Sequence, residues 1–318
     1  MTTDVRLGIV SWNTAAMLDR ALASLPDALG GLKAEVVVVD NASNDSSVEI
    51  ARRHGGIEVV ANDSNLGYAR AMNEALAGTT ARALIALNPD TEAPPRSLEK
   101  LVTTLDEHPS AALVAPVLVD SNGLPQRSVY PYPGLVQALE TGFVPKAWRR
   151  DCTPRGSSIR TLRRRWAVGA VHCIRKAALG DELPYSTRWF MYVEDIELCW
   201  RLEKNGWRNL LREDVTVAHH GNAAGMQRWG EGADLELKSL SNIYDWLWSD
   251  RSPLQARATA LVNVLGVAAK RCALQAGAAV TGGPRAEQWR RRAEKLGHLA
   301  AYHSRILRSR PEPRQNAE

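Results

Sequence analysis

The sequence has few cysteines and phenylalanines and no long apolar run. Among its 318 residues there are two phenylalanines and four widely separated cysteines, with no CxxC pair, at Cys152, Cys173, Cys199 and Cys272. This spacing argues against a zinc ribbon or a disulfide framework and suits a reducing cytoplasm. No apolar stretch approaches the ~20 residues that span a bilayer, and the N-terminus lacks the charged and apolar segments of a signal peptide. We therefore expect a cytoplasmic protein.

The usual phosphate-binding motifs are also missing. The sequence contains neither GxxxxGK followed by Ser or Thr, nor GxGxxG after a strand. Their absence disfavours a P-loop nucleotidase and a dinucleotide dehydrogenase. The composition, with 45% hydrophobic and 24% charged residues and a net charge of +5, is that of an ordinary globular protein. If the chain binds a nucleotide, it must hold it in another way.

Strand and helix patterns alternate through the first part of the chain. The β-branched run at 35–40 is typical of a strand buried on both faces, and Leu18, Leu22 and Leu25 recur with helical spacing. Similar patterns predict further strands and helices, with strands at 6–10, 57–60, 83–87 and 113–119, helices at 68–76 and 98–107, and a capping box at Ser46 and Glu49. This alternation predicts an α/β fold with a mostly parallel sheet flanked by helices.

Polar residues follow the ends of several predicted strands. They are Ser11, Asn13, Asp40, Asn41, Asn88 and Asp90. The carboxyl ends of parallel strands lie on one edge of a sheet, where ligands bind in the crevice. We therefore expect these side chains to converge, although each of them is also an ordinary turn residue.

A second acidic stretch lies far along the chain. Glu194 and Asp195 come directly before a helical pattern that ends near Gly206, and His219 and His220 follow after two short predicted strands. A carboxylate and an imidazole in one cleft can supply a base and a metal ligand. The alternative is that the two carboxylates only cap the helix and interact with its dipole.

The region 121–165 is rich in proline and in basic residues. Prolines are expected to interrupt any regular element there, and the basic residues are Lys146, Arg149, Arg150, Arg155, Arg160, Arg163, Arg164 and Arg165. They indicate a surface loop that meets an anionic group, or a loop whose charges are simply solvated. A single strand is predicted at 166–174, where Gly169 and Ala170 are small enough for a ligand to approach closely.

Beyond residue 232 the pattern is helical and basic. An amphipathic basic helix of this kind can lie on an anionic membrane face. It can equally pack on the rest of the protein with its charges in water.

Seven short segments, in this order and spacing, carry a family resemblance. They are VSWN at 10–13, VVVDNASND at 37–45, NLGYARAMN at 65–73, LNPDTE at 87–92, VGAV at 168–171, FMYVEDIELCWR at 190–201 and AHH at 218–220. The series resembles the family 2 glycosyltransferases, and among them the bacterial rhamnosyltransferases that use dTDP-rhamnose. The resemblance extends over roughly residues 6–224, and the order and spacing of the segments make it more specific than any one of them.

The resemblance implies a fold and a division of the chain. The family has the GT-A fold, a nucleotide-binding sheet with an acceptor side behind it. On this chain we expect a glycosyltransferase domain at 1–232, with a nucleotide-sugar half at 1–120 and an acceptor or catalytic half at 121–232. A helical, basic extension at 233–318 would follow it.

The resemblance also implies roles for individual residues. The residues expected to bind the donor are Ser11, Asn13, Asp40, Asn41, Asn65, Gly67, Arg70, Asn88 and Asp90. Asp40 would contact the nucleobase or the ribose, whereas the reach of Arg70 to the diphosphate is our own inference. Gly169, Ala170 and Trp189 are expected on the acceptor side.

The resemblance also implies a metal site and a catalytic base. Asn88 stands where the family has the first carboxylate of its Asp-x-Asp motif, which leaves Asp90 as the main carboxylate ligand of Mg²⁺ or Mn²⁺. His219 matches the second ligand, with His220 as a substitute. Asp195 matches the catalytic base, and the adjacent charge of Glu194 is expected to raise the pKa of whichever of the two carboxyls is less solvated.

The implied reaction is an inverting, metal-dependent sugar transfer. The expected donor is dTDP-rhamnose, and the acceptor is a hydroxyl of a glycolipid, a polysaccharide precursor or a natural product. Alternatives are another donor, such as UDP-galactofuranose, UDP-GlcNAc or a different dTDP-deoxysugar, and a non-catalytic sugar-nucleotide-binding protein at a membrane. The basic segments suit a polyprenyl-diphosphate-linked acceptor and peripheral contact at the inner face of the plasma membrane; no nucleic-acid partner is expected.

Overall fold

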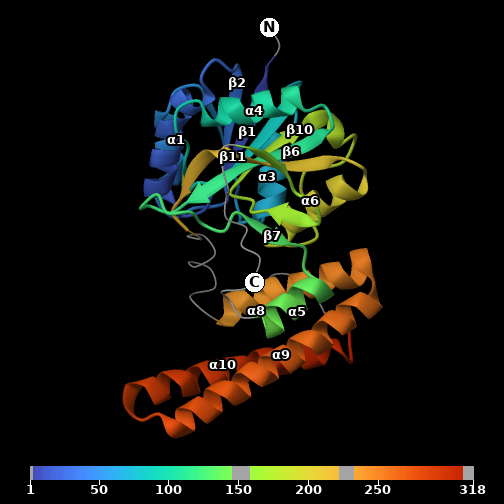
Figure 1. Cartoon of the computed structure of the whole chain (residues 1–318). Coiled ribbons are helices and arrows are strands. Elements are labelled where there is room, and N and C mark those ends of the chain that lie inside the picture. The colour runs from blue at the N-terminus through green and yellow to red at the C-terminus, as the bar shows by residue number, and fades with distance from the viewer. Residues whose placement is uncertain (1–2, 145–157, 222–232, 311–318) are drawn as a thin grey trace. The chain divides into compact units, whose positions relative to one another are not determined.

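The protein forms two compact units. Its structure, a computed structural model, describes residues 3–144, 158–221 and 233–310 (Figure 1). The sheet unit contains Met1–Pro131 and Cys152–Arg228, and the helical unit contains Tyr132–Asp151 and Trp229–Glu318. The expected boundary at residue 232 falls outside the described residues, so the division into 1–232 and 233–318 stays a prediction.

A large mixed sheet organises the sheet unit. Its strand order is β3-β2-β1-β4-β10-β6-β11-β5, with β8 paired to β11, and a separate ribbon joins β7 to β9. The strands are β1 Val5–Ser11, β2 Ala34–Asp40, β3 Ile57–Ala61, β4 Ala83–Leu87, β5 Thr91–Glu92, β6 Ala111–Val119, β7 Val129–Pro131, β8 Ile159–Thr161, β9 Arg165–Ala167, β10 Val171–Arg175 and β11 Arg208–His219. Strands β3, β2, β1 and β4 run parallel, as do β6 and β11, and β10 runs antiparallel between β4 and β6. The mostly parallel sheet is therefore confirmed.

Helices cover both faces of this sheet. They are α1 Ala15–Leu29, α2 Ser47–Arg53, α3 Tyr68–Leu76, α4 Ser97–Glu107, the short 3-10 helix η2 Lys176–Ala178 and α6 Glu194–Lys204. Successive side chains of a strand point to opposite faces. In β1, Leu7 packs into the core beneath α1 and α4, whereas Gly8 faces Met72 and Ala75 of α3.

The same alternation places α6. In β11, Leu210 belongs to the core beneath α4. Its neighbour Asn209 points the other way and donates from Nδ2 to Cys199 O of α6 at 2.7 Å. Helix α6 therefore shares the α3 face, and its first residues, Glu194 and Asp195, lie on that side of the sheet.

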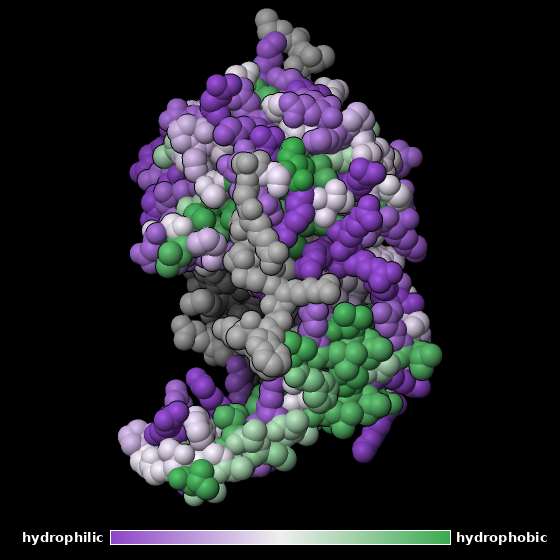
Figure 2. All heavy atoms as spheres, in the orientation of Figure 1, coloured by the Kyte–Doolittle hydropathy of each residue, from purple (hydrophilic) through white to green (hydrophobic). Residues whose placement is uncertain are grey.

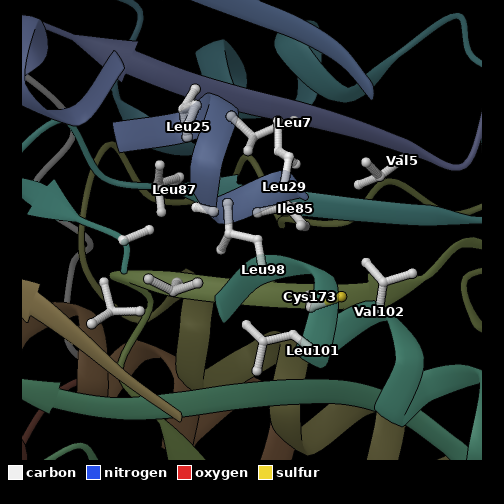
Figure 3. Packing of buried hydrophobic residues seen from close by; sticks show 14 of the residues in the cluster. Val5, Leu7, Leu25, Leu29, Ile85, Leu87, Leu98, Leu101, Val102 and Cys173 are labelled. Atoms are coloured by element: carbon white, nitrogen blue, oxygen red, sulfur yellow. The ribbon is translucent and has the colours of Figure 1, made fainter. Parts of the chain in front are cut away.

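The core lies between β1, β4 and the helices α1 and α4. Figure 3 shows Leu7 of β1 and Leu87 of β4 with Leu25 of α1 and Leu98 of α4 gathered in one cluster. Since all four side chains are buried, the hydrophobic effect fixes both helices on this face.

Three predictions about elements in this unit are wrong. The strand predicted at 166–174 is split into β9 and β10, because β9 pairs with β7 in the ribbon whereas β10 enters the large sheet. The two short strands predicted before the histidines are the single strand β11. The Ser46 side chain makes no cap hydrogen bond; instead Asp45 Oδ1 accepts from Ser47 N at 3.0 Å and from Ser47 Oγ at 2.6 Å.

The helical unit contains the expected C-terminal helices and one that was not expected. Its elements are α5 Leu135–Phe143, α8 Ala233–Trp246, the π-helical turn η3 Leu247–Arg251, α9 Pro253–Val280 and α10 Gly283–Ile306. Tyr244 Oη of α8 accepts from Asn263 Nδ2 of α9 at 3.0 Å and lies 2.8 Å from His303 Nδ1 of α10. These contacts tie three helices together.

Helix α5 lies in the proline-rich region where no regular element was predicted. It begins two residues after Pro133 and ends two residues before Pro145, so these prolines flank the helix rather than interrupt it. None of the helices in the part of the chain that the structure describes combines the length and apolar character needed to cross a lipid bilayer.

Replacing Leu98 with alanine tests the core. Leu98 is fully buried, so the substitution should lower the free energy of unfolding by ~2–5 kcal/mol through lost burial and a residual cavity. Urea unfolding measures the change. The matched control is Leu124→Ala at a site that is 62% exposed, where the effect should stay within ~0.5 kcal/mol. Equal effects of the two substitutions would contradict this packing.

Candidate active site

A cavity of about 470 Å³ opens at the carboxyl ends of β1, β2 and β4. Many residues that the sequence analysis selected line it: Asn41, Asn65, Gly67, Asn88, Asp90, Gly169, Ala170, Glu194, Asp195 and His219. Segments that are 178 positions apart in the chain, at Asn41 and His219, therefore meet at one cavity. Polar strand ends converge here, as expected for parallel strands.

Three other predicted residues lie behind the cavity wall. Asp40 accepts hydrogen bonds from Ser43 N at 2.8 Å and from Ser43 Oγ at 2.6 Å. The backbone N–H of Asn13 donates to the same Ser43 Oγ at 2.8 Å, and Ser11 Oγ lies 2.9 Å from Thr14 Oγ1. These bonds join the loops after β1 and β2, and they hold neighbouring side chains, including that of Thr14, at the cavity.

Two more predicted residues are outside the lining. Arg70 is exposed on α3. Trp189 is buried, with the guanidinium of Arg188 4.8 Å from its ring. Their predicted roles toward the donor and the acceptor therefore stay predictions.

Gly67 fixes the loop that precedes α3. Its φ of +84° lies in the left-handed region, and a Cβ at this position would stand 2.4 Å from Phe190 O. The same Phe190 carbonyl accepts a hydrogen bond from Tyr68 N at 2.9 Å. Only glycine fits such a close backbone approach, which ties the loop before α3 to the loop before α6.

The carboxyls of Glu194 and Asp195 lie at the start of α6, where Glu194 is buried and Asp195 is partly buried. Asp195 Oδ2 accepts from Gly169 N at 3.1 Å and Oδ1 accepts from Ile196 N at 2.9 Å. Glu194 Oε2 is buried and has no hydrogen-bond partner among the residues that the structure describes. Two backbone donors from other residues thus support a negative charge on Asp195, whereas Glu194 has only its own backbone N–H.

The pKa values of the two carboxyls follow from these surroundings. Burial raises the pKa of Asp195 to about 6, against the opposing effect of the Gly169 and Ile196 N–H groups. Burial raises the pKa of Glu194 to about 8, and the charge of Asp195 adds to the rise. Asp195 is therefore the carboxyl that ionises first as the pH rises, and Glu194 retains its proton to higher pH.

The residues directly before this pair have an uncommon backbone conformation. Tyr192 has φ 70° and Val193 has φ 82°. A β-branched residue with positive φ is a genuine outlier, and such residues cost of order 1–3 kcal/mol each. The neighbouring loop supplies Phe190, Met191 and Tyr192 to the cavity, so the strain is located at the site itself.

The side chains of Asp90 and His219 lie next to each other in the lining of the cavity. His219 Nε2 lies 3.6 Å from Asp90 Oδ1. Gln126 orients the imidazole from behind, because its Nε2 donates to His219 O at 2.8 Å and its Oε1 lies 3.1 Å from His219 Nδ1. An amide oxygen only accepts, so Nδ1 carries a proton, and Nε2 is the ring nitrogen that faces Asp90. The sequence analysis did not select Gln126.

His220 belongs to a different network. Its Nε2 lies 2.8 Å from Glu92 Oε1 and its Nδ1 lies 2.8 Å from Ser121 Oγ. Arg20 Nε also donates to Glu92 Oε1 at 2.7 Å. Both ring nitrogens of His220 are therefore engaged away from Asp90, so the pairing with Asp90 falls to His219.

An aromatic wall that the sequence analysis missed also faces the cavity. The rings of Tyr130 and Trp166 stack with centroids 5.2 Å apart and planes inclined by 20°, and both residues line the cavity. Trp166 Nε1 donates to Pro131 O at 3.2 Å. The sequence contains ten tryptophans, nine of them after residue 145, but this abundance does not distinguish Trp166 from Trp189.

Two solved structures share the fold over nearly the whole chain. One is the mannosyltransferase PcManGT from Pyrobaculum calidifontis in complex with GDP-Man and Mn²⁺, with a TM-score of 0.59 and 19% identity over 97% of this chain and 88% of that chain. The other is TarS 1-349 of S. aureus, with a TM-score of 0.52 and 14% identity over 96% and 89% of the two chains. The expected GT-A fold of a glycosyltransferase is confirmed.

The family follows from the sequence match. The family described as Glycosyl transferase family 2 matches residues 7–179, more than half of the chain. The chain therefore belongs to glycosyl transferase family 2. It is 27% identical over 239 residues to N-acetylglucosaminyl-diphospho-decaprenol L-rhamnosyltransferase of Mycobacterium tuberculosis, in the strains CDC 1551 and H37Rv, and the match covers 69% of this chain and 77% of the relative.

The raised pKa of Glu194 predicts how stability depends on pH. Because the pKa of the folded state lies above the ordinary value of 4.5, at about 8, the folded state binds the proton more tightly. Its contribution to stability is full below about pH 4.5 and is lost as the pH rises toward 8. Glu194→Gln should remove this decline, by up to ~1.4 kcal/mol per pH unit.

Urea unfolding at several pH values measures the slope. Glu107→Gln, at an exposed position of α4, is the matched control and should keep the slope of the unsubstituted protein. If Glu194→Gln also kept that slope, the protonated state assigned to Glu194 would be wrong.

Proposed function

We propose that the protein is an inverting, metal-dependent rhamnosyltransferase that moves L-rhamnose from dTDP-rhamnose to a hydroxyl of a polyprenyl-diphosphate-linked sugar. The observation that carries the proposal is one cavity lined by Asp195 and by the Asp90–His219 pair. The acceptor class is supported by the name of the mycobacterial relative, whose length is 77% covered. We further propose that the reaction takes place on the cytoplasmic side of the membrane that holds such an acceptor.

Asp195 is the proposed base. The acceptor hydroxyl passes its proton to this carboxylate as its oxygen attacks the sugar, a role that typically contributes 10²–10⁴-fold to the rate. The N–H groups of Gly169 and Ile196 keep the carboxylate oriented. Glu194 holds its own proton and is not a second nucleophile, so displacement by a single attacking oxygen inverts the anomeric carbon.

The residues at the other side of the cavity fit a divalent cation. Asp90 offers a carboxylate, and His219 offers the ring nitrogen Nε2, which Gln126 orients toward Asp90. Asn88 Oδ1 is buried without a hydrogen-bond partner among the described residues, so a neutral oxygen is present as well. When bound there, Mg²⁺ or Mn²⁺ would supply positive charge to the leaving diphosphate.

The protein ligands at this position are few. The described residues contain no group of three or more His, Cys, Asp or Glu side chains arranged to hold a metal ion. A cation bound by Asp90 and His219 would therefore take its other ligands from the diphosphate and from water, which is how Mg²⁺ is commonly held.

The donor and the acceptor are proposed to occupy different walls. Asn41, Asn65 and Gly67 line the part next to β2 and α3, where we place the nucleotide; Ser11, Asn13 and Asp40 would shape the same part through the loops that they join. The stacked rings of Tyr130 and Trp166 flank the turn at Gly169 and Ala170, where we place the acceptor sugar. Aromatic faces and small residues suit the apolar face of a pyranose.

A transfer assay tests the proposed function. The protein is incubated with Mg²⁺ or Mn²⁺, a short-chain polyprenyl-diphosphate GlcNAc and, in turn, dTDP-rhamnose, UDP-galactofuranose or UDP-GlcNAc. Mass spectrometry should detect the glycosylated product with dTDP-rhamnose. A product with a UDP-sugar alone would overturn the donor, and dTDP binding without any release of dTDP would identify a non-catalytic binding protein.

Asp195→Asn should abolish the transfer. We expect the rate to fall by ~10²–10⁴-fold because the acceptor hydroxyl loses its base. The affinity for dTDP, measured by calorimetry, should stay unchanged, since the base acts on the acceptor. Loss of dTDP binding in this variant would contradict the assignment.

His219→Ala should raise the Mn²⁺ concentration that half-maximal activity requires, by about tenfold or more, because one of two protein ligands is lost. Titration of Mn²⁺ by electron paramagnetic resonance, with dTDP present, gives the affinity independently of turnover. His220→Ala is the matched control and should leave the titration unchanged, since both its ring nitrogens are engaged with Glu92 and Ser121. The reverse pattern would transfer the role to His220.

A further inference from the structure

The helical unit has a long apolar stripe on α9. Its exposed members recur at steps of three, four or seven residues and so lie on one side of the helix: Leu254, Leu261, Leu265, Ala268, Cys272, Ala276 and Ala279. Leu265 is 53% exposed and Leu254 is 79% exposed. A helix whose outward side is apolar over most of its length is not explained by packing within the helical unit.

Helix α5 extends this stripe into a broader face. Val136, Leu139 and Phe143 are exposed on α5, with Phe143 at 53% and Val136 at 68%. The two helices touch through glycines, because a Cβ on Gly266 would stand 2.6 Å from Gly142 Cα. Figure 2 shows the resulting apolar area over α5 and the adjoining half of α9. We call these exposed side chains the α5–α9 face.

Basic residues border this face. Arg257 and Arg271 are exposed on α9, and α9 contains no acidic residue at all. Helix α10, which packs along α9, is also basic, with Arg285, Arg290, Arg291, Arg292, Lys295 and Arg305 against only Glu287 and Glu294. A partner of this face is therefore expected to be apolar, with negative charge near Arg257 and Arg271.

We propose that the α5–α9 face binds an anionic lipid surface. The apolar side chains would enter the boundary between headgroups and acyl chains, and Arg257 and Arg271 would meet the lipid phosphates. A second copy of the chain fits less well, because α9 carries no acidic residues that could pair with the basic residues of a copy, and like charges across an interface repel. The proposal rests on the proposed function in one respect: a polyprenyl-linked acceptor is found at such a surface.

Flotation with lipid vesicles tests the proposal on the full chain. One set of vesicles contains phosphatidylcholine alone and the other equal parts of phosphatidylcholine and phosphatidylglycerol. The protein should float with the anionic vesicles, more weakly as salt is raised. The triple variant Leu139→Gln, Phe143→Gln and Leu265→Gln should bind these vesicles about tenfold or more weakly, because three apolar side chains no longer enter the lipid.

Two further variants separate the apolar and the charged parts. The pair Arg257→Gln and Arg271→Gln should weaken binding to the anionic vesicles only. The control pair Leu124→Gln and Leu183→Gln changes exposed leucines of the sheet unit, at 62% and 56% exposure, and should bind as the unsubstituted protein does. Circular dichroism melting verifies that every variant folds.

Three results would overturn the proposal. They are an unsubstituted protein that stays in solution with both kinds of vesicle, a triple variant that floats as well as the unsubstituted protein, and a dimer in gel filtration that the triple variant dissociates. The proposed function is judged separately, by dTDP release from dTDP-rhamnose with a water-soluble short-chain acceptor. The triple variant should retain this activity, so a failure of membrane binding and a failure of the chemistry give different results.

Discussion

The Gly169 N–H donates to Asp195 Oδ2 at 3.1 Å, at the point where the chain leaves the β7–β9 ribbon and enters the large sheet. The next residue, Ala170, accepts from Asn88 N at 2.9 Å, and the Tyr68 hydroxyl lies 3.4 Å from Gly169 O. This turn thereby joins the end of β4, the start of α3 and the start of α6. Because β9 and β10 pair in different sheets, the N–H of Gly169 lies between two ladders and is free to orient the carboxylate. The turn at Gly169 and Ala170 thus fixes the position of the proposed base relative to the end of β4, which Asn88 and Asp90 follow.

The same arrangement places destabilising features at the site. Two carboxyls lie side by side at Glu194, which is buried, and Asp195, which is partly buried, and the backbone before them is strained at Tyr192 and Val193. Such features persist only where the surrounding structure over-determines them. Here the helix that bears the carboxyls is fixed by buried contacts such as Asn209 to Cys199 O, and the sheet is fixed on its other face by the core around Leu98. The favourable packing of the core therefore offsets the unfavourable free energy of the adjacent carboxyls and of the strained backbone at the site.

The parts that the sequence predicted are those fixed by local pattern. The strand at 83–87 and the helix at 68–76 have the predicted limits, since a short apolar run or a helical period is set by neighbouring residues. The convergence of Asn41, Asn88 and Asp90 also follows, because parallel strands end at the same edge. The pairing of Asp90 with His219 required the family resemblance, since no local pattern relates residues 129 positions apart.

The features of the site that were not predicted depend on pairing between segments that are far apart in the chain. The break at 168–170 arises because β7, some forty positions earlier, pairs with β9. The mostly apolar sequence at 166–174 does not reveal this pairing. Gln126 orients His219 only because the loop after β6 folds back, with Gln126 N donating to Leu118 O at 2.8 Å. Tyr130 and Trp166 face the cavity for the same reason, as cross-strand neighbours in the ribbon. Composition showed that tryptophan is abundant but not which tryptophan is placed at the site.

Asn88 stands where the resemblance implies a carboxylate, and a neutral amide at this position is understandable in terms of charge. Asp90, Glu194 and Asp195 already line one cavity, and a further carboxylate would add to their mutual repulsion. An amide keeps an oxygen in position without a charge. With one carboxylate and one imidazole, the proposed cation would be held weakly until a diphosphate supplied more oxygens. Donor and cation would therefore stabilise each other's binding, and neither would be held firmly alone.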